Sequence, residues 1–233
     1  MKIGIIGAMA EEIALLKSSM QIDETVNYYG SDFFTGTLHG VPIVLVESGI
    51  GKVNATISTV LLIEHFDVTA VINTGSAGAV DPALSIGDVV VANYLIHHDV
   101  DVTGFGYKPG QMAGMPEGYF CDAELVRLAQ DAVRRQGVEP VLGLIVSGDE
   151  FVNSVERVDA IRETFPKARA CEMESAAIAQ AAYAMDVPFV IVRAISDSAD
   201  QSAAVTFDEF IIDAGRQSAR MIEDIILNLS QEG

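Results

Sequence analysis

The sequence predicts an α/β fold in which a twisted mixed β-sheet is flanked by helices on both faces. Strand-like and helix-like segments alternate along most of the 233 residues, which is typical of α/β proteins. The strand-like segments are almost continuously apolar, as in residues 188–195 (PFVIVRAI), and such strands are usually covered on both faces. Half of the residues are hydrophobic and only 20% are charged, so a large core is expected. Because no polar linker interrupts this pattern, we expect a single domain over residues 1–233.

Short apolar or β-rich runs predict the strands. Residues 33–38 and 41–47 flank His39-Gly40, and two such runs around a two-residue turn favour a hairpin. The other strands are expected at residues 2–7, 70–73, 87–96, 141–147 and 188–195. The strand at 70–73 is expected to end in a turn of small residues, 74–78.

Apolar residues at steps of three and four predict the helices, which are expected at residues 11–20, 52–65, 122–136 and 171–185. Residues 153–156 and 206–209 each combine a capping side chain with a Glu three positions later, a pattern that opens helices. The second of them is expected to begin a long C-terminal helix. Residues 104–119, rich in Gly, Pro and aromatic residues, show no periodicity, which indicates a long ordered loop, called the flap below.

The composition excludes several classes of protein. The net charge is −19, from 14 Lys and Arg against 33 Asp and Glu, and such a field repels nucleic acids and anionic membrane surfaces. Two cysteines do not make a disulfide framework, and no spacing of Cys and His indicates a metal. The N-terminal residues do not resemble a signal peptide, and no apolar run is long enough for a membrane span. We therefore expect a cytoplasmic protein without a metal or a cofactor.

Candidate functional groups follow strands, where ligands of open α/β sheets bind. Ser196-Asp197 ends the last predicted strand, and Asp197 is either a catalytic acid or the cap of a turn. Glu11-Glu12 either compensates the dipole of the first helix or places one carboxylate in a cleft. Glu172, Met173 and Glu174 are either the solvated start of a helix or part of a site. Phe151 and Phe207 either pack in the core or stack on a planar base.

The combination of motifs is more specific than any one of them. MKIGIIGAMAEEIALL, SGIGKVNA, INTGSAGA, HHDVDVTGFGY, GLIVSGDEFV, EMESAAIA and VRAISDSAD occur in this order along the chain. This series resembles the bacterial 5′-methylthioadenosine/S-adenosylhomocysteine nucleosidases over essentially the whole length. The resemblance implies a nucleoside-phosphorylase-like fold, a homodimer, and no metal or cofactor. It also implies cleavage of both nucleosides, and of 5′-deoxyadenosine, to adenine and the corresponding sugar, in methionine salvage and the activated-methyl cycle.

The resemblance also implies roles for individual residues. Asp197 would be the general acid that protonates adenine at N7, and Glu12 the general base that activates water. Glu174 and Met173 would hold the ribose, while Phe151 would stack on adenine and the Val152 backbone would read its edge. The full set implied to bind substrate comprises Met9, Ile50, Ser76, Ala77, Gly78, Phe151, Val152, Glu172, Met173, Glu174, Arg193, Ser196 and Phe207. Val102, Phe105 and Tyr107 are implied to enter the pocket of the partner subunit.

Three alternatives remain beside this interpretation. A purine nucleoside phosphorylase would use the same fold, but phosphate needs cationic or N–H donors near the sugar, where this chain has Glu12 and Asn73. A futalosine-type nucleosidase would use similar residues on a bulkier substrate. A nucleoside-binding sensor without catalysis would be expected to lack Asp197 or Glu12.

Overall fold

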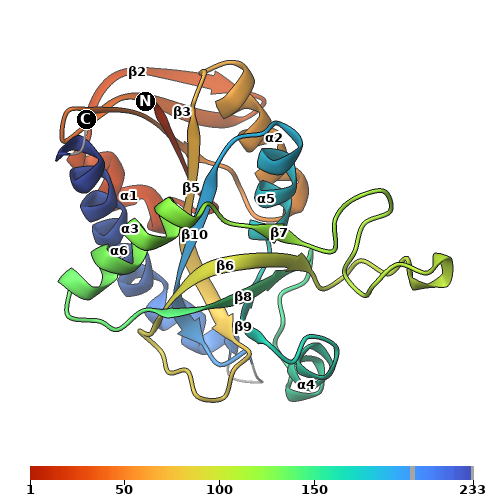
Figure 1. Cartoon of the computed structure of the whole chain (residues 1–233). Coiled ribbons are helices and arrows are strands. Elements are labelled where there is room, and N and C mark those ends of the chain that lie inside the picture. Colours follow the sequence, from red (N-terminus) through yellow and green to blue (C-terminus); the bar gives the residue numbers. More distant parts are fainter. Residues whose placement is uncertain (200–202, 232–233) are drawn as a thin grey trace.

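A ten-stranded mixed sheet forms the centre of the molecule (Figure 1). The computed structural model describes residues 1–199 and 203–231, without the side chains of residues 203–208 and 231. The strands are β1 (Ile3–Gly7), β2 (Gln21–Tyr28), β3 (Ser31–Leu38), β4 (Val41–Glu47), β5 (Ala70–Ala79), β6 (Val89–His97), β7 (Tyr119–Phe120), β8 (Val141–Ser147), β9 (Ala168–Glu172) and β10 (Phe189–Asp197).

The pairing of the strands is both parallel and antiparallel, as predicted. Strands β4, β1, β5 and β10 are parallel neighbours, whereas β2, β3 and β4 form an antiparallel meander. The hairpin predicted around His39-Gly40 joins β3 to β4 and is confirmed. Strands β5, β10, β6, β8 and β9 form a closed circuit, because β9 pairs back onto β5. The circuit brings the ends of distant segments of the chain together.

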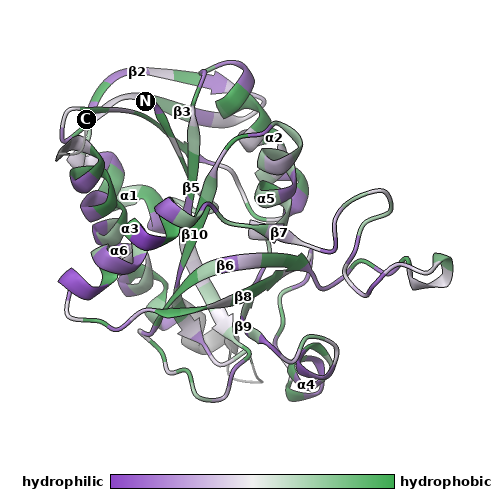
Figure 2. Cartoon of the chain, in the orientation of Figure 1, coloured by the Kyte–Doolittle hydropathy of each residue, from purple (hydrophilic) through white to green (hydrophobic). Residues whose placement is uncertain are grey.

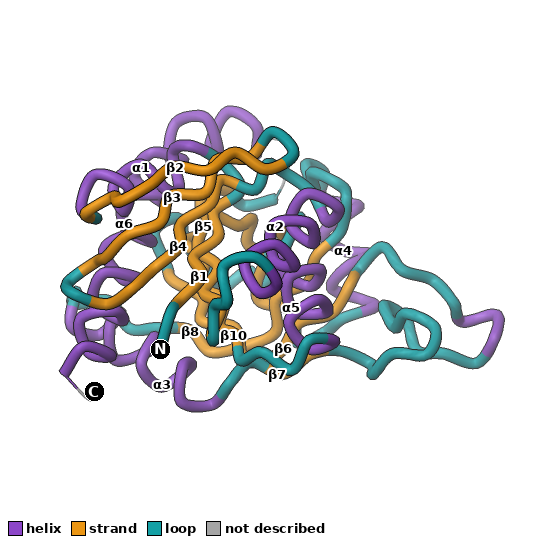
Figure 3. Tube along the Cα trace, turned by 90° about the horizontal axis from the view of Figure 1, so that it is seen from above, coloured by secondary structure: helices purple, strands orange, loops and turns teal. Residues whose placement is uncertain are grey.

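Helices cover both faces of the sheet (Figures 1 and 3). Helices α1 (Ala10–Ser19), α3 (Ala123–Arg135) and α6 (Ala203–Gln231) lie on one face, and α2 (Lys52–Glu64) and α5 (Ser175–Ala184) lie on the other. The remaining helices are α4 (Val155–Thr164) and a 3-10 turn, η1 (Thr103–Phe105), where the flap begins. Each helical layer packs on its own apolar cluster, and the hydropathy of the strands between them is visible in Figure 2. None of the described helices combines the length and apolarity needed to cross a membrane.

The packing of helix α1 sets the direction of Glu12. Its Ile13 and Leu16 are buried in the apolar cluster beneath α6, and α1 packs along α6. Glu12, one position before Ile13, is also buried. Because successive helical residues point in directions about 100° apart, burying Ile13 and Leu16 turns Glu12 toward the end of the sheet.

Three predicted boundaries are wrong. Strand β5 does not end at Asn73 but continues to Ala79, because β10 pairs with it along this length. The helix predicted at 171–185 begins only at Ser175, since residues 168–172 form β9 between β8 and β5. The C-terminal helix begins at Ala203 and not after the capping pattern at residues 206–209. In the first two cases, tertiary pairing overrides the local preference of a run of small residues.

Candidate active site

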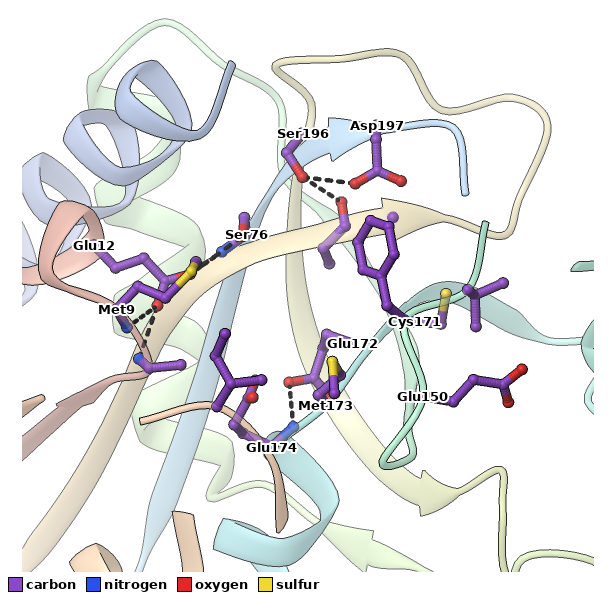
Figure 4. Close-up of a pocket in the computed structure, with 16 residues that line it drawn as sticks. Met9, Glu12, Ser76, Glu150, Cys171, Glu172, Met173, Glu174, Ser196 and Asp197 are labelled. Carbon is purple, nitrogen blue, oxygen red and sulfur yellow. Dashed lines mark hydrogen bonds between the residues drawn. The ribbon is translucent and has the colours of Figure 1, made fainter. Parts of the chain in front are cut away.

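A pocket of about 320 Å³ opens where several strands end, and this volume suits a small molecule. Its walls are the β1–α1 turn and the first turn of α1, the loop before α2, the second half of β5, the loop after β8, the β9–α5 junction and the end of β10. The lining residues are Ala8, Met9, Glu12, Ile50, Ser76, Ala77, Gly78, Glu150, Phe151, Val152, Cys171, Glu172, Met173, Glu174, Ser196 and Asp197. Figure 4 shows Glu12 and Asp197 on different walls, with Ser76 and Ser196 between them.

The carboxylate of Glu12 is fixed by four donors. Oε2 accepts hydrogen bonds from the backbone N–H groups of Ala8 (2.8 Å) and Met9 (3.2 Å). Oε1 accepts from the backbone N–H of Ser76 (2.9 Å) and from its hydroxyl (3.2 Å). Burial raises the pKa of Glu12 above its usual value, although the charge of Arg193 and these N–H groups act in the opposite direction. A carboxylate that is fixed and more basic than a free glutamate suits the acceptance of a proton.

The carboxyl of Asp197 is buried at the end of β10. Oδ2 accepts a hydrogen bond from the hydroxyl of Ser196 (2.9 Å), and Oδ1 accepts one from the backbone N–H of Ala199 (2.8 Å). The strand end therefore presents a carboxyl of defined orientation to the pocket (Figure 4). The bond from Ala199 makes Asp197 the cap of a turn, one of the two roles that the sequence predicted, while its place in the pocket leaves the other open.

A buried arginine lies beneath the pocket. The side chain of Arg193 is 1% exposed, and its Nη2 donates to Oδ1 of Asn73 (2.6 Å), to the hydroxyl of Ser175 (2.8 Å) and to Glu172. The same nitrogen lies 3.7 Å from Oε2 of Glu174. An uncompensated buried charge is costly, and these acidic and polar partners supply the compensation.

Gly75 provides the space in which Arg193 and Glu12 approach each other across β5. A Cβ at this position would lie 2.2 Å from Nη1 of Arg193 and 2.7 Å from Oε1 of Glu12. Both distances are far shorter than van der Waals contact, so any side chain at position 75 would displace one of the two charged groups. The proximity also explains why the charge of Arg193 acts on the pKa of Glu12.

Two neighbouring glutamates differ sharply in their electrostatics. Burial opposes ionisation of Glu172, but Arg193 and the donors on Ser147 and Ser175 outweigh it and lower its pKa. Burial and the charge of Glu172 together raise the pKa of Glu174 to about 8, against the effects of Arg193 and the N–H of Gly51. Glu172 is therefore the ionised partner of the arginine, while Glu174 gains and loses its proton near neutral pH.

The comparisons with known proteins agree with this architecture. The model of the phosphorylase superfamily matches residues 2–227. A 5′-methylthioadenosine/S-adenosylhomocysteine nucleosidase of Lysinibacillus sphaericus is 48% identical over 230 residues, covering 98% of this chain and 100% of the relative. The chain belongs to this nucleosidase family. A crystal structure of the Neisseria meningitidis nucleosidase with methylthio-immucillin-A has a TM-score of 0.96 at 46% identity, covering 97% of this chain and 99% of that one.

Another similar structure in the family's fold bears a different name. The futalosine hydrolase of Helicobacter pylori matches with a TM-score of 0.92 at 35% identity, covering 97% of each chain. Its identity to this chain is lower than that of the nucleosidases from L. sphaericus and N. meningitidis. Membership of the nucleosidase family and the nucleoside-phosphorylase-like fold, both predicted from the motifs, are confirmed.

The pocket of this family member gathers most of the predicted site residues. Those that line it are Met9, Glu12, Ile50, Ser76, Ala77, Gly78, Phe151, Val152, Glu172, Met173, Glu174, Ser196 and Asp197. Arg193 lies beneath the lining instead of in it. Phe207 falls in α6, and its side chain lies outside the described residues. Val102, Phe105 and Tyr107 do not line the pocket of their own chain.

Sequence reasoning missed three lining residues, Ala8, Glu150 and Cys171. Each is adjacent to a residue that was predicted to bind substrate, so its position in a motif could have identified it. Its residue type alone could not. Glu172 and Glu174 were expected inside a helix, but they lie at the junction of β9 and α5. This junction turns both carboxyls toward Arg193.

The raised pKa of Glu174 leads to a prediction about stability. The pKa of Glu174 is about 8 in the folded protein and about 4.3 in the unfolded chain. The contribution of this group to the free energy of unfolding is therefore fully present below its unfolded pKa and is lost as the pH rises through 8. Glu174→Gln keeps an acceptor for the N–H of Gly51 and removes the charge. We expect the variant to be more stable than the wild type by at least about 1 kcal/mol at pH 8 and by much less at pH 5, as measured by thermal unfolding.

The exposed Glu163 offers the matched control, since Glu163→Gln makes the same chemical change without burial. Its difference from the wild type should not depend on pH in this way. A Glu174→Gln variant with the same stability change at pH 5 and pH 8 would show that the charge of Glu174 is not costly in the fold.

Proposed function

We propose that the chain hydrolyses the N-glycosidic bond of 5′-methylthioadenosine and S-adenosylhomocysteine, releasing adenine and the corresponding thioribose. The same chemistry would extend to 5′-deoxyadenosine. The observation that carries the proposal is the pair of buried carboxyls, Glu12 and Asp197, on different walls of one small-molecule pocket. Relatives named for this activity match the chain over nearly its full length.

The reaction needs an acid on one side of the scissile bond and a base on the other. As the bond between C1′ and N9 breaks, its electron pair moves to the adenine ring, and Asp197 donates a proton to N7. Protonation turns a poor leaving group into a neutral base, and this kind of proton transfer contributes about 10²–10⁴ in rate. The hydrogen bonds from Ser196 and Ala199 hold the carboxyl in one orientation.

On the other side, Glu12 accepts a proton from water as its oxygen attacks C1′. The donors on Ala8, Met9 and Ser76 keep the carboxylate in place, and Arg193 lies close enough to limit the rise of its pKa. The sugar carries positive charge in the transition state, and preorganised anionic groups stabilise such charge. Inverting glycosidases use the same division of labour between two carboxyls.

The remaining walls fit the two halves of the substrate. Phe151 is 43% exposed at the mouth, where its ring would stack on adenine, and the backbone of Val152 would read the edge of the base. Met173 and Glu174 lie at the β9–α5 junction, where Glu174 would bind the ribose hydroxyls. Met9 and Ile50 would enclose the 5′ thioether, for which soft apolar side chains are suitable partners.

A phosphorylase reaction is disfavoured by the charges of the pocket. Among the described lining residues none is Lys or Arg, whereas Glu12, Glu150, Glu172, Glu174 and Asp197 are acidic. Phosphate would face several carboxyls without a lining cation, while water faces no such repulsion. A futalosine-type activity is the second candidate because of the similarity to the H. pylori futalosine hydrolase.

The direct test measures adenine released from 5′-methylthioadenosine with and without phosphate. We expect the same rate in both cases and free methylthioribose as the second product. Dependence on phosphate, with a sugar phosphate as product, would contradict hydrolysis. Faster release from futalosine than from either thionucleoside would favour the second candidate.

A second prediction concerns the carboxyl pair. Glu12→Gln and Asp197→Asn preserve shape but cannot accept or donate the proton in question, so each should lose at least about 100-fold in kcat while still binding adenine. Steady-state kinetics and calorimetry with adenine measure the two effects. Glu11→Gln is the matched control, because Glu11 is exposed on the first turn of α1 and should retain wild-type turnover.

We further propose a homodimer. Val53, Ile57 and Val60 are exposed along one side of α2, and Phe105 in the flap is 87% exposed. Exposed apolar side chains of this kind often mark an interface. The flap projects away from the body of the chain (Figure 3), which supports the expectation that Val102, Phe105 and Tyr107 reach the pocket of a partner. Sedimentation as a fully active monomer would contradict this arrangement.

The extent of the family match, residues 2–227, supports the expectation of one nucleosidase domain over the whole chain. The cytoplasmic location stays a prediction.

A further inference from the structure

A ring of three polar contacts joins three segments that are far apart in the sequence. Lys52 begins α2, Asp99 follows β6, and Asp149 follows β8. Nζ of Lys52 donates to Oδ1 of Asp99 (2.7 Å), and the backbone N–H of Asp149 donates to Oδ2 of the same carboxylate (2.9 Å). The backbone N–H of Lys52 donates to Oδ1 of Asp149 (2.7 Å) and closes the ring. We call these three residues the clasp.

The clasp is more than a surface ion pair. The side chains of Lys52 and Asp99 are only 19% and 23% exposed, and hydrogen bonds of this charge-assisted kind are short and strong. Burial opposes ionisation of Asp99, but Lys52 and the N–H of Asp149 outweigh it and lower its pKa. The carboxylate is thus ionised and uses both oxygens within the ring.

The backbone beside the clasp is shaped to allow it. Gly51 has a φ of 97°, a conformation that favours glycine. A Cβ there would also lie 3.0 Å from Oδ1 of Asp149. A side chain at position 51 would therefore strain the backbone and crowd the carboxylate of Asp149.

Each end of the clasp continues directly into a wall of the pocket. On one side, the N–H of Gly51 donates to Oε1 of Glu174 (2.8 Å), and Ile50 lines the pocket. On the other side, the chain continues from Asp149 to Phe151 and Val152, which also line the pocket. The clasp therefore joins the segment assigned to the sugar to the segment assigned to the base.

We propose that Lys52, Asp99 and Asp149 are positioning residues that hold the adenine-binding residues in register with the ribose-binding Glu174. This role rests on the proposed function for its assignment of base and sugar. The clasp places the bond between C1′ and N9 at a fixed point between Glu12 and Asp197. Rigid positioning of this kind lowers the entropic cost of binding the substrate.

The test uses Asp99→Asn, which removes the charge and one of the two acceptor oxygens. The loop after β8 should lose its anchor, so adenine affinity should fall and KM should rise by about tenfold. The value of kcat should change by less than about threefold, since the groups that transfer protons are untouched. Lys52→Gln should reproduce both effects, because it removes the ammonium group but keeps the backbone N–H to Asp149.

The double variant decides whether the clasp acts as a unit. Asp99→Asn combined with Lys52→Gln should be no worse than either single variant, because removal of one partner already opens the ring. Multiplication of the two single effects would overturn the proposal. Glu124→Gln is the matched control, since Glu124 pairs with Arg127 at 2.5 Å on α3, away from the pocket. If Asp99→Asn and Glu124→Gln bound adenine with the same affinity, this result would also overturn the proposal.

Hydrogen exchange separates this proposal from the proposed function, because it requires neither substrate nor turnover. In Asp99→Asn, exchange should accelerate at the amides of residues 149–153 and of the first turn of α2, and remain unchanged in the strands. Uniform acceleration along the chain would indicate general destabilisation and overturn the positioning role. Failure of the wild type to release adenine would refute the hydrolase assignment alone.

Discussion

One buried cation, Arg193, sets the charge balance of three of the acidic residues that line the pocket. It faces three buried glutamates, Glu12, Glu172 and Glu174. Burial lowers the pKa of Arg193, but the negative charges of these glutamates outweigh the effect of burial and raise it. The three acids do not share it equally. Glu172 takes its hydrogen bond directly, and the other two are left with raised pKa values.

This unequal sharing has a chemical use. A single arginine cannot neutralise three carboxylates, so the site keeps excess negative potential. This potential does little for a neutral nucleoside, but it stabilises the positively charged sugar of the transition state. The potential is restrained in the resting enzyme, because Glu174 can hold a proton near neutral pH. The same excess would repel phosphate, so one feature favours both the cationic transition state and the choice of water as nucleophile.

The parts of the structure that the sequence predicted best are those with a local cause. The hairpin at His39-Gly40 and the helix predicted at residues 122–136 depend on nearby residues, and both are present, with Asp122 as the cap of α3. The pairing of β9 with β8 and β5 has no local signal, because a run of Ala and Cys favours helix as readily as strand. Strand β2, which was not predicted, is an edge strand that is exposed at most positions and is held by β3 alone.

The same distinction applies to the site. Motif resemblance predicted Glu12, Asp197 and Glu174 by position, and all three line the pocket. It did not predict that Asn73 and Ser175 join Glu172 around Arg193, because these contacts span up to 120 positions. It also gave no reason for the proximity of Lys52 and Asp99, which only the ends of α2 and β6 bring together.

The closed circuit of β5, β10, β6, β8 and β9 limits how this enzyme can evolve and move. A strand in an open sheet can slide or peel from an edge, but a strand in a loop of neighbours can shift only if every other strand shifts with it. The floor of the pocket therefore behaves as a single rigid frame. Differences in substrate range between relatives should accumulate in the loops that rise from that frame, and inhibitors that discriminate between them would have to contact those loops.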